Sequence, residues 1–219
     1  MQNFAFTAPS VLERIYDALD ERGRLPREFS LQQALVPGAT AQGFFYSDGF
    51  MEGNLTGLEK GEEKSPELQA VLRQVFSGEY DQAVQGLKDF FGDGEGHLMN
   101  TYVLPLQQWV DAHREELDPE PLIWFAHRLL QEADQGEIIK FALSLLEFFD
   151  LQEEEEVAED IRLLARCNEF TLFCVRDFLQ WNDGQEEIFQ TARQVYGWGR
   201  IAALEYLEPR TAQIRQWML

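Results

Sequence analysis

Positive charge is scarce in this chain of 219 residues. It has 18 Lys and Arg against 39 Asp and Glu, which gives a formal net charge of −21. Residues 1–100 hold 8 basic and 16 acidic residues, and residues 101–219 hold 10 and 23, so neither half is basic. Proteins that grip DNA or RNA neutralise phosphates with clustered Lys and Arg, and an anionic membrane repels an acidic surface. We therefore expect no nucleic-acid partner and no membrane partner.

Cysteines and long apolar runs are also few. Cys167 and Cys174 are the two cysteines, and on one helix they would lie roughly 10 Å apart along the axis, too far for a disulfide. Their apolar neighbours predict buried, inert thiols. The apolar runs are much shorter than the ~20 residues that span a bilayer, and residues 1–6 lack the basic and apolar regions of a signal peptide. These absences predict a reduced protein in the cytoplasm.

Patterns that carry chemistry are missing as well. The histidines, His97, His113 and His127, lack the spacing of helical zinc or di-iron sites. Residues 92–96 are rich in Gly but lack the Lys-Ser/Thr of a phosphate-binding loop. The acidic run 153–156 is typical of a solvated helix start that the helix dipole stabilises. We expect no metal, no cofactor and no catalytic residue, and hence a protein that is not an enzyme.

What the chain does contain is a series of short amphipathic segments. We expect helices at about 11–22, 31–35, 66–77, 79–91, 101–117, 119–133, 136–150, 153–167, 169–182, 185–197, 199–208 and 210–219. Their limits are marked by residues that cap or break helices, such as Ser65-Pro66, Asp118-Pro119 and Gly184.

Residues 36–61 interrupt this series, because six glycines replace the helical periodicity. The aromatic stretch 43–50, with its Asp48-Gly49 turn, has two interpretations. One is a small β-hairpin, and the other is an irregular loop whose aromatic side chains plug the end of a helical stack.

Residues 76–83 resemble the turn between the two helices of a tetratricopeptide repeat. Gly78, Tyr80 and Ala83 match that family's Gly-x-Tyr-x-x-Ala pattern, in which the small Ala lets the helices approach and the Tyr packs across the turn. The match covers one repeat, residues 66–91, and lacks the family's Trp-Leu-Gly start. It implies one helical hairpin rather than an array of such repeats.

A weak internal repeat follows. Leu122, Val157 and Ile188 begin apolar stripes at nearly equal intervals, and each interval suits a unit of two helices. Over residues 119–219 this pattern resembles the HEAT/armadillo class of helical repeats. The resemblance implies a fold class that is all-α, a right-handed stack of antiparallel helix pairs (an α-α superhelix), with the short irregular or β-hairpin segment near 36–61. We expect an N-terminal part at 1–62 and the repeat domain at 63–219.

Stacked helical arrays usually bind other macromolecules, so we expect a non-enzymatic scaffold for another protein. The candidate partner-binding residues are Trp198, Arg200, Arg193, Trp217 and Trp181. The arginines of the C-terminal stretch either form ion pairs with the acidic helices before them or line a surface for an acidic segment.

Two alternatives remain open. One is a ligand-binding or enzymatic all-α domain, with a pocket between residues 36–61 and the helices that contains a group such as His113 or Tyr46. The other is a homo-oligomer that forms through the apolar C-terminal residues 217–219.

Overall fold

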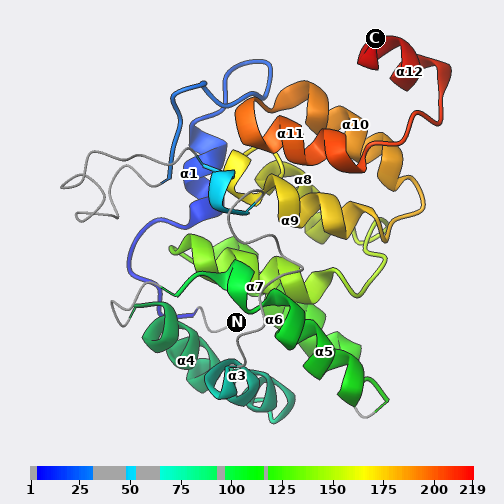
Figure 1. Cartoon of the computed structure of the whole chain (residues 1–219). Coiled ribbons are helices and arrows are strands. Elements are labelled where there is room, and N and C mark those ends of the chain that lie inside the picture. Colours follow the sequence, from blue (N-terminus) through cyan, green and yellow to red (C-terminus); the bar gives the residue numbers. More distant parts are fainter. Residues whose placement is uncertain (1–3, 32–47, 53–64, 93–96, 116–117) are drawn as a thin grey trace. The chain divides into compact units, whose positions relative to one another are not determined.

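The computed structural model describes residues 4–31, 48–52, 65–92, 97–115 and 118–219, and within these ranges it is all-α (Figure 1). The chain forms two compact units. Unit 1 comprises residues 1–14 and 56–148, and unit 2 comprises residues 15–55 and 149–219. This division does not coincide with the expected parts at 1–62 and 63–219, because each unit combines an N-terminal stretch with a later one.

The described helices follow the expected series closely. In chain order they are α1 (Val11–Asp17), α3 (Pro66–Phe76), α4 (Tyr80–Gly92), the 3-10 turn η3 (Met99–Thr101), α5 (Val103–His113), α6 (Pro119–Glu132), α7 (Gly136–Leu146), α8 (Glu155–Leu164), α9 (Asn168–Phe178), α10 (Gly184–Gln194), α11 (Gly197–Tyr206) and α12 (Ala212–Met218). None of these helices is long and apolar enough to cross a membrane. The helix expected at 31–35 and the segment at 36–61 fall mostly outside the described residues. In the part of that segment that is described, residues 48–52, a turn leads into helical residues.

Helix α1 ends earlier than its apolar pattern predicts, at Asp17 instead of Arg22. Asp20 closes a tight turn there, because its carboxylate accepts hydrogen bonds from the backbone N–H groups of Arg22 (2.9 Å) and Arg24 (2.8 Å). These N–H groups, that of Arg24 above all, lower the pKa of Asp20. Gly23 completes the turn with a φ of +69°, a conformation that favours glycine.

In unit 1, α3 and α4 form the hairpin that the tetratricopeptide resemblance implies. Ser65 caps α3 by accepting a hydrogen bond from the Leu68 N–H (3.1 Å), and Gly78 turns the chain with a φ of +73°. Ala83 is fully buried where the two helices meet. Gly86 brings them closer still, since a Cβ there would lie 3.0 Å from Cγ2 of Val71.

Tyr80 does not pack across the turn as the resemblance implies. Its ring lies 4.7 Å from that of Trp124 and stacks at 5.9 Å on that of Phe125, both in α6. Phe4 contacts the same two rings, at 6.1 and 5.6 Å, and the Phe4 N–H donates to the Glu132 carboxylate. Tyr80 therefore joins the hairpin to the rest of unit 1, through an aromatic cluster that also holds the N-terminal residues.

Helix α7 is the centre of unit 1. All nine residues from Ile138 to Leu146 are buried, and the helix contacts α4, α5, α6 and η3. A helix that is apolar on every side must be covered on every side. Its one buried cation, Lys140, lies 2.7 Å from Glu137 Oε1, and Ser144 donates to the Lys140 carbonyl (2.8 Å).

Helix α9 has the same position in unit 2. Its residues from Glu169 to Val175 are all buried, and it contacts α8, α10 and α11. The contact with α11 requires Gly199, since a Cβ there would lie 2.5 Å from Oδ1 of Asn168 and 2.6 Å from Oγ1 of Thr171. Helix α9 thus packs on its sequence neighbours α8 and α10 and on α11, the helix after next.

Two glutamines clamp the successive connections of unit 2. Gln152, before α8, accepts a hydrogen bond from the Asp183 N–H (3.0 Å) and donates to its carboxylate (3.2 Å). Gln185, in the first turn of α10, accepts from the Glu208 N–H (2.7 Å) and donates to the Tyr206 carbonyl (3.2 Å). The two glutamines precede or begin successive helix pairs, and each starts a Gln-Glu-Glu triplet. Each fixes its own helix pair to the connection that follows.

The start of α10 supplies a stability test. A Cβ on Gly184 would lie 1.8 Å from the Phe178 carbonyl oxygen, so Gly184→Ala forces the backbone apart. We expect it to lower the free energy of unfolding by about 1–3 kcal/mol, measured by urea denaturation. Gly92→Ala is the matched control, because a Cβ there meets nothing within 4 Å. Equal stability of the two variants would contradict the close approach of α10 to the end of α9.

Candidate functional site

Arginine supplies all of the positive charge of unit 2. The unit contains 10 Arg, no Lys, and 20 Asp and Glu. The planar guanidinium binds carboxylates through two parallel hydrogen bonds, which an ammonium group cannot do. Arg162 shows the usual outcome in such an acidic setting, with Nε 3.0 Å and Nη2 2.7 Å from Oε1 of Glu187. Three other arginines behave differently.

Arg27 and Arg200 lie against the ring of Tyr196, which directly precedes α11. The Arg27 Cζ is 4.8 Å from the ring centroid, and the Arg200 Cζ is 5.6 Å from it. The Nε of Arg200 also donates to the Ala192 carbonyl at the end of α10 (2.9 Å). Stacking on an aromatic ring orients a guanidinium and leaves its edge free for hydrogen bonds.

Arg166, just after α8, is the third member. Its Nη1 donates to the Gly23 carbonyl (3.1 Å), which the turn at Asp20 presents. Its Nε is buried and has no hydrogen-bond partner among the described residues. Burial lowers the pKa of this guanidinium, which nevertheless stays charged at neutral pH.

A small pocket lies between Arg27, Arg166 and Tyr196, and Arg200 adjoins it through the Tyr196 ring. Arg27 and Arg166 line it together with Tyr196 and Asn168, and its volume is about 20 Å³. The Oδ1 of Asn168 is buried and accepts no hydrogen bond from the described residues. A volume of this size holds one water-sized group. We call Arg27, Arg166, Arg200 and Tyr196 the arginine cluster.

No carboxylate among the described residues forms a salt bridge with the three arginines of the cluster. The remaining residues of unit 2, 32–47 and 53–55, contain no Asp or Glu. Because unit 2 has twice as many acids as bases, unneutralised arginines that converge on one ring are unexpected. Such a cluster suits an external carboxylate, which would supply the missing counter-charge.

The five residues predicted from the sequence fall in three places. Trp198 and Arg200 lie at the start of α11, where the Trp198 ring packs edge-on against Phe50 at 5.0 Å and is half-buried. Arg193 and Trp217 both contact Phe189, at 5.5 and 5.4 Å.

Trp181 is no accessible anchor. It is 4% exposed and packs on Phe178 at 4.9 Å. Its indole belongs to the core of unit 2.

The arginines of the C-terminal stretch do not all follow one of the two expected patterns. Arg210 pairs with Glu208 in its own loop (2.7 Å), and Arg215 donates to the carbonyls of Pro209 and Arg210. Neither Arg193 nor Arg200 forms an ion pair with a described residue of the acidic helices. Of these arginines, Arg200 therefore remains a candidate for contact with an acidic segment, as a member of the arginine cluster.

Sequence reasoning missed Arg27, Arg166 and Tyr196. Arg27 and Arg166 come from opposite ends of the chain, one before α3 and the other after α8, and no local pattern joins them. A signal was present in the composition, however, since the residues that form unit 2 contain Arg and no Lys. That bias is typical of sites where guanidinium geometry matters.

The histidines and acids form no metal site among the described residues. His113 stacks on Trp109 at 4.1 Å, and its Nδ1 lies 2.7 Å from the Trp109 carbonyl. Tyr46, the other residue expected in a pocket, lies outside the described part of the chain.

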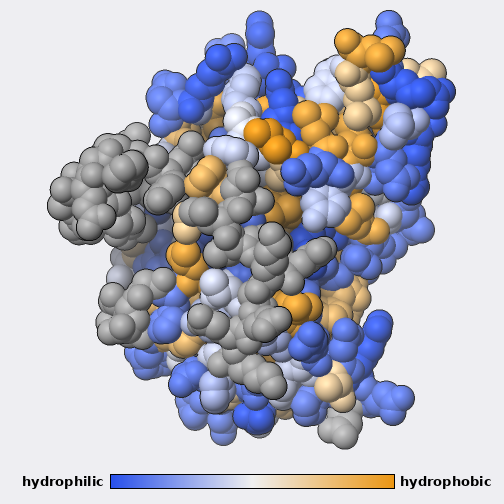
Figure 2. Space-filling view, in the orientation of Figure 1, coloured by the Kyte–Doolittle hydropathy of each residue, from blue (hydrophilic) through white to orange (hydrophobic). Residues whose placement is uncertain are grey.

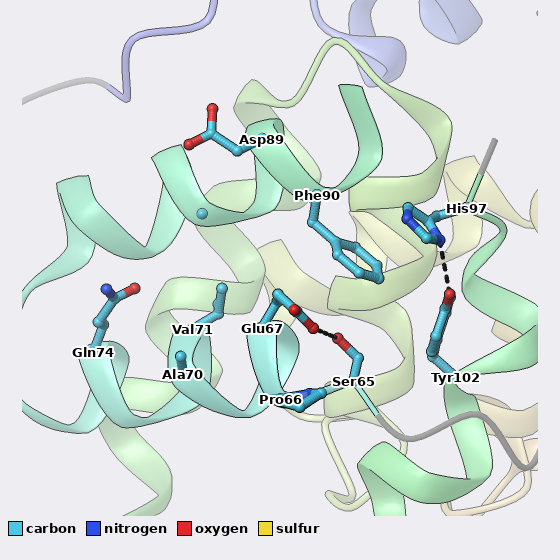
Figure 3. Close-up of a pocket in the computed structure, with 11 residues that line it drawn as sticks. Ser65, Pro66, Glu67, Ala70, Val71, Gln74, Asp89, Phe90, His97 and Tyr102 are labelled. Carbon is cyan, nitrogen blue, oxygen red and sulfur yellow. Dashed lines mark hydrogen bonds between the residues drawn. The ribbon is translucent and has the colours of Figure 1, made fainter. Parts of the chain in front are cut away.

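Unit 1 does contain a cavity, at a different place from the one predicted. It has a volume of about 710 Å³ and lies between α3 and α4, with His97 and Tyr102 at one end (Figure 3). It is separate from the arginine cluster, which belongs to unit 2.

Comparison with protein-family models, with curated proteins and with solved structures finds no match to this chain.

The thiols of unit 2 give a chemical test of the fold. Cys174 is fully buried, and burial, then the charges of Asp177 and Cys167, raises its pKa well above the ordinary value. Since the thiolate is the reactive form, we expect both cysteines of the native protein to resist a thiol reagent such as DTNB at pH 7 to 9. Both should react at once in guanidinium chloride. Rapid labelling of the native protein would contradict the burial of α9.

Proposed function

We propose that this protein is a non-enzymatic helical-repeat scaffold that binds an acidic segment of another protein through the arginine cluster of unit 2. The observation that carries the proposal is that Arg27 and Arg200 lie against the Tyr196 ring, and Arg166 lines a pocket with that ring, without a described carboxylate partner. Carboxylates of Asp or Glu side chains match guanidinium groups in charge and in geometry.

The repeat character rests on the packing of unit 2. Helix α9 contacts its sequence neighbours α8 and α10 and also α11, the helix after next, as expected when helix pairs stack in a row. The clamps of Gln152 and Gln185 repeat the same kind of connection in successive helix pairs. We propose that this unit belongs to the α-α superhelix type, with HEAT/armadillo repeats as its nearest analogue in pattern.

The C-terminal helix offers a second surface. Trp217, Met218 and Leu219 are 37%, 44% and 107% exposed, and Figure 2 shows hydrophobic surface over the end of α12. Apolar side chains grouped in this way favour association. We propose this surface for the self-association considered from the sequence, as a contact separate from the arginine cluster.

The test is capture of partners from a cell lysate by the full chain, compared between two double variants. Arg27→Ala with Arg200→Ala removes two charges from the cluster. Arg210→Ala with Arg215→Ala removes two charges from the same unit, at residues that bond within their own loop. We expect the cluster variant to weaken binding of a captured partner by about tenfold or more, since a charge-assisted hydrogen bond contributes about 1.5–3 kcal/mol. The loop variant should bind as the wild type does.

Competition completes the experiment. A Glu-rich peptide should displace the partner from the wild type, and its Gln-substituted counterpart should not. Equal capture by both double variants would refute the assignment of the cluster. Light scattering of the same samples reports whether the chain also associates with itself.

A further inference from the structure

The cavity of unit 1 is a groove between two helices of the α3–α4 hairpin. Glu67, Ala70, Val71 and Gln74 recur at the i, i+3, i+4, i+7 spacing of one helix face. On α4, Gly86 opposes this face at close range, since a Cβ there would lie 3.0 Å from Cγ2 of Val71. The floor of the groove is therefore apolar, with a polar group of α3 at each end (Figure 3).

Both polar groups of the α3 face present hydrogen-bond acceptors. Glu67 Oε2 accepts from the Ser65 hydroxyl (3.0 Å), which leaves its other oxygen open to a ligand. The Oε1 of Gln74 is buried and has no described hydrogen-bond partner. Asp89 adds a second carboxylate on the α4 rim, and the described lining contains no Lys or Arg. Acceptors without a neighbouring Lys or Arg suit a ligand that brings a cation with N–H donors.

The end of the groove near Glu67 is aromatic. Phe90 stacks on His97, with ring centroids 4.4 Å apart and an interplanar angle of 8°. Tyr102 meets Phe90 edge-on at 5.2 Å, and its hydroxyl lies 2.8 Å from Nδ1 of His97. These contacts hold the rings in place, as Figure 3 shows. An aromatic wall beside a carboxylate attracts organic cations.

We propose that this groove binds a primary alkylammonium compound, with the ammonium at Glu67 and the aromatic wall and the alkyl chain along Ala70 and Val71 toward Gln74. Glu67 and Gln74 lie two helical turns apart, about 10 Å along the helix, which matches the length of a short alkyl chain. A volume of about 710 Å³ lies within the range of small-molecule sites. This site is independent of the arginine cluster, so either can fail without the other.

Isothermal titration calorimetry of the full chain with hexylamine and with 1-hexanol tests the proposal, since the two probes differ in the charged head and share the chain. At neutral pH we expect hexylammonium to bind at one site and at least about tenfold more tightly than the alcohol. Glu67→Gln should weaken hexylammonium by at least about threefold. Ala70→Trp, at an exposed position of α3, should fill the groove and abolish binding.

Asp81→Asn is the matched control for Glu67→Gln. Each removes one acid from the first turn of a helix of the same hairpin, and Asp81 does not line the groove. Binding by Asp81→Asn should equal that of the wild type. Equal weakening by both variants would show attraction to the acidic chain as a whole and would overturn the proposal. So would equal affinity for the alcohol, absence of binding, or binding retained by an Ala70→Trp protein whose circular dichroism and unfolding midpoint match the wild type.

Discussion

Each unit depends on one helix that has no face for water. In α7 every side chain from Ile138 to Leu146 is buried, and in α9 every one from Glu169 to Val175. Such a helix is stable only when other helices cover it on all sides, so α4, α5 and α6 must converge on α7, and α8, α10 and α11 on α9. The hydroxyl groups of Thr171 and Ser144 on these helices find local acceptors. Thr171 donates to the carbonyls of Cys167 and Ala165, and Ser144 to that of Lys140. The covering helices are amphipathic because each of them needs only one buried face.

The packing around α9 is the feature of unit 2 that supports the proposed helical repeat. A central helix that contacts its neighbours before and after, and also the helix after next, makes each pair depend on the next one along the chain. The clamps of Gln152 and Gln185 then fix the connections, since each side-chain amide replaces backbone partners that the loops lack. Glycine sets the distances: Gly184 allows α10 to begin against the Phe178 carbonyl, and Gly199 allows α11 to approach Asn168. Neither glycine lies in the left-handed region. Glycine is therefore required at both positions by the close contact and not by the backbone conformation.

The helices could be predicted from the sequence because their determinants are local. Ser65-Pro66, Asp118-Pro119 and Gly184 mark helix starts through hydrogen bonds and sterics that involve only nearby residues. Helix ends were predicted too late by several residues, as at Leu146, since apolar periodicity continues into the turns.

The contacts that join distant stretches of the chain could not be predicted. Phe4 packs on Trp124 and Phe125, and Arg166 bonds Gly23 from a distant part of the chain. Trp181 was a candidate partner-binding residue although its side chain is buried, because aromatic residues of core and surface look alike in sequence. The recurrence of Gln-Glu-Glu at Gln152 and Gln185 was visible, and it supports the proposed repeat more directly than the apolar stripes do.

In the proposed function, the arginines bind an acidic segment against the electrostatic field of an acidic chain. Unit 2 holds twice as many acids as bases, so a negatively charged segment is repelled at distances where the whole charge acts. Attraction begins only near Arg27, Arg166 and Arg200, where the low dielectric of the pocket and the Tyr196 ring strengthens the local interaction. We expect this arrangement to slow the association of an acidic segment with the protein and to make binding selective among acidic segments. A segment whose negative charge is spread out gains no affinity from one small cluster of arginines. A segment whose carboxylates meet all three guanidinium groups gains the full interaction. In the proposed function, the excess of acid makes the cluster selective, and the acidic charge of unit 1 favours the cation proposed for the groove beside Glu67.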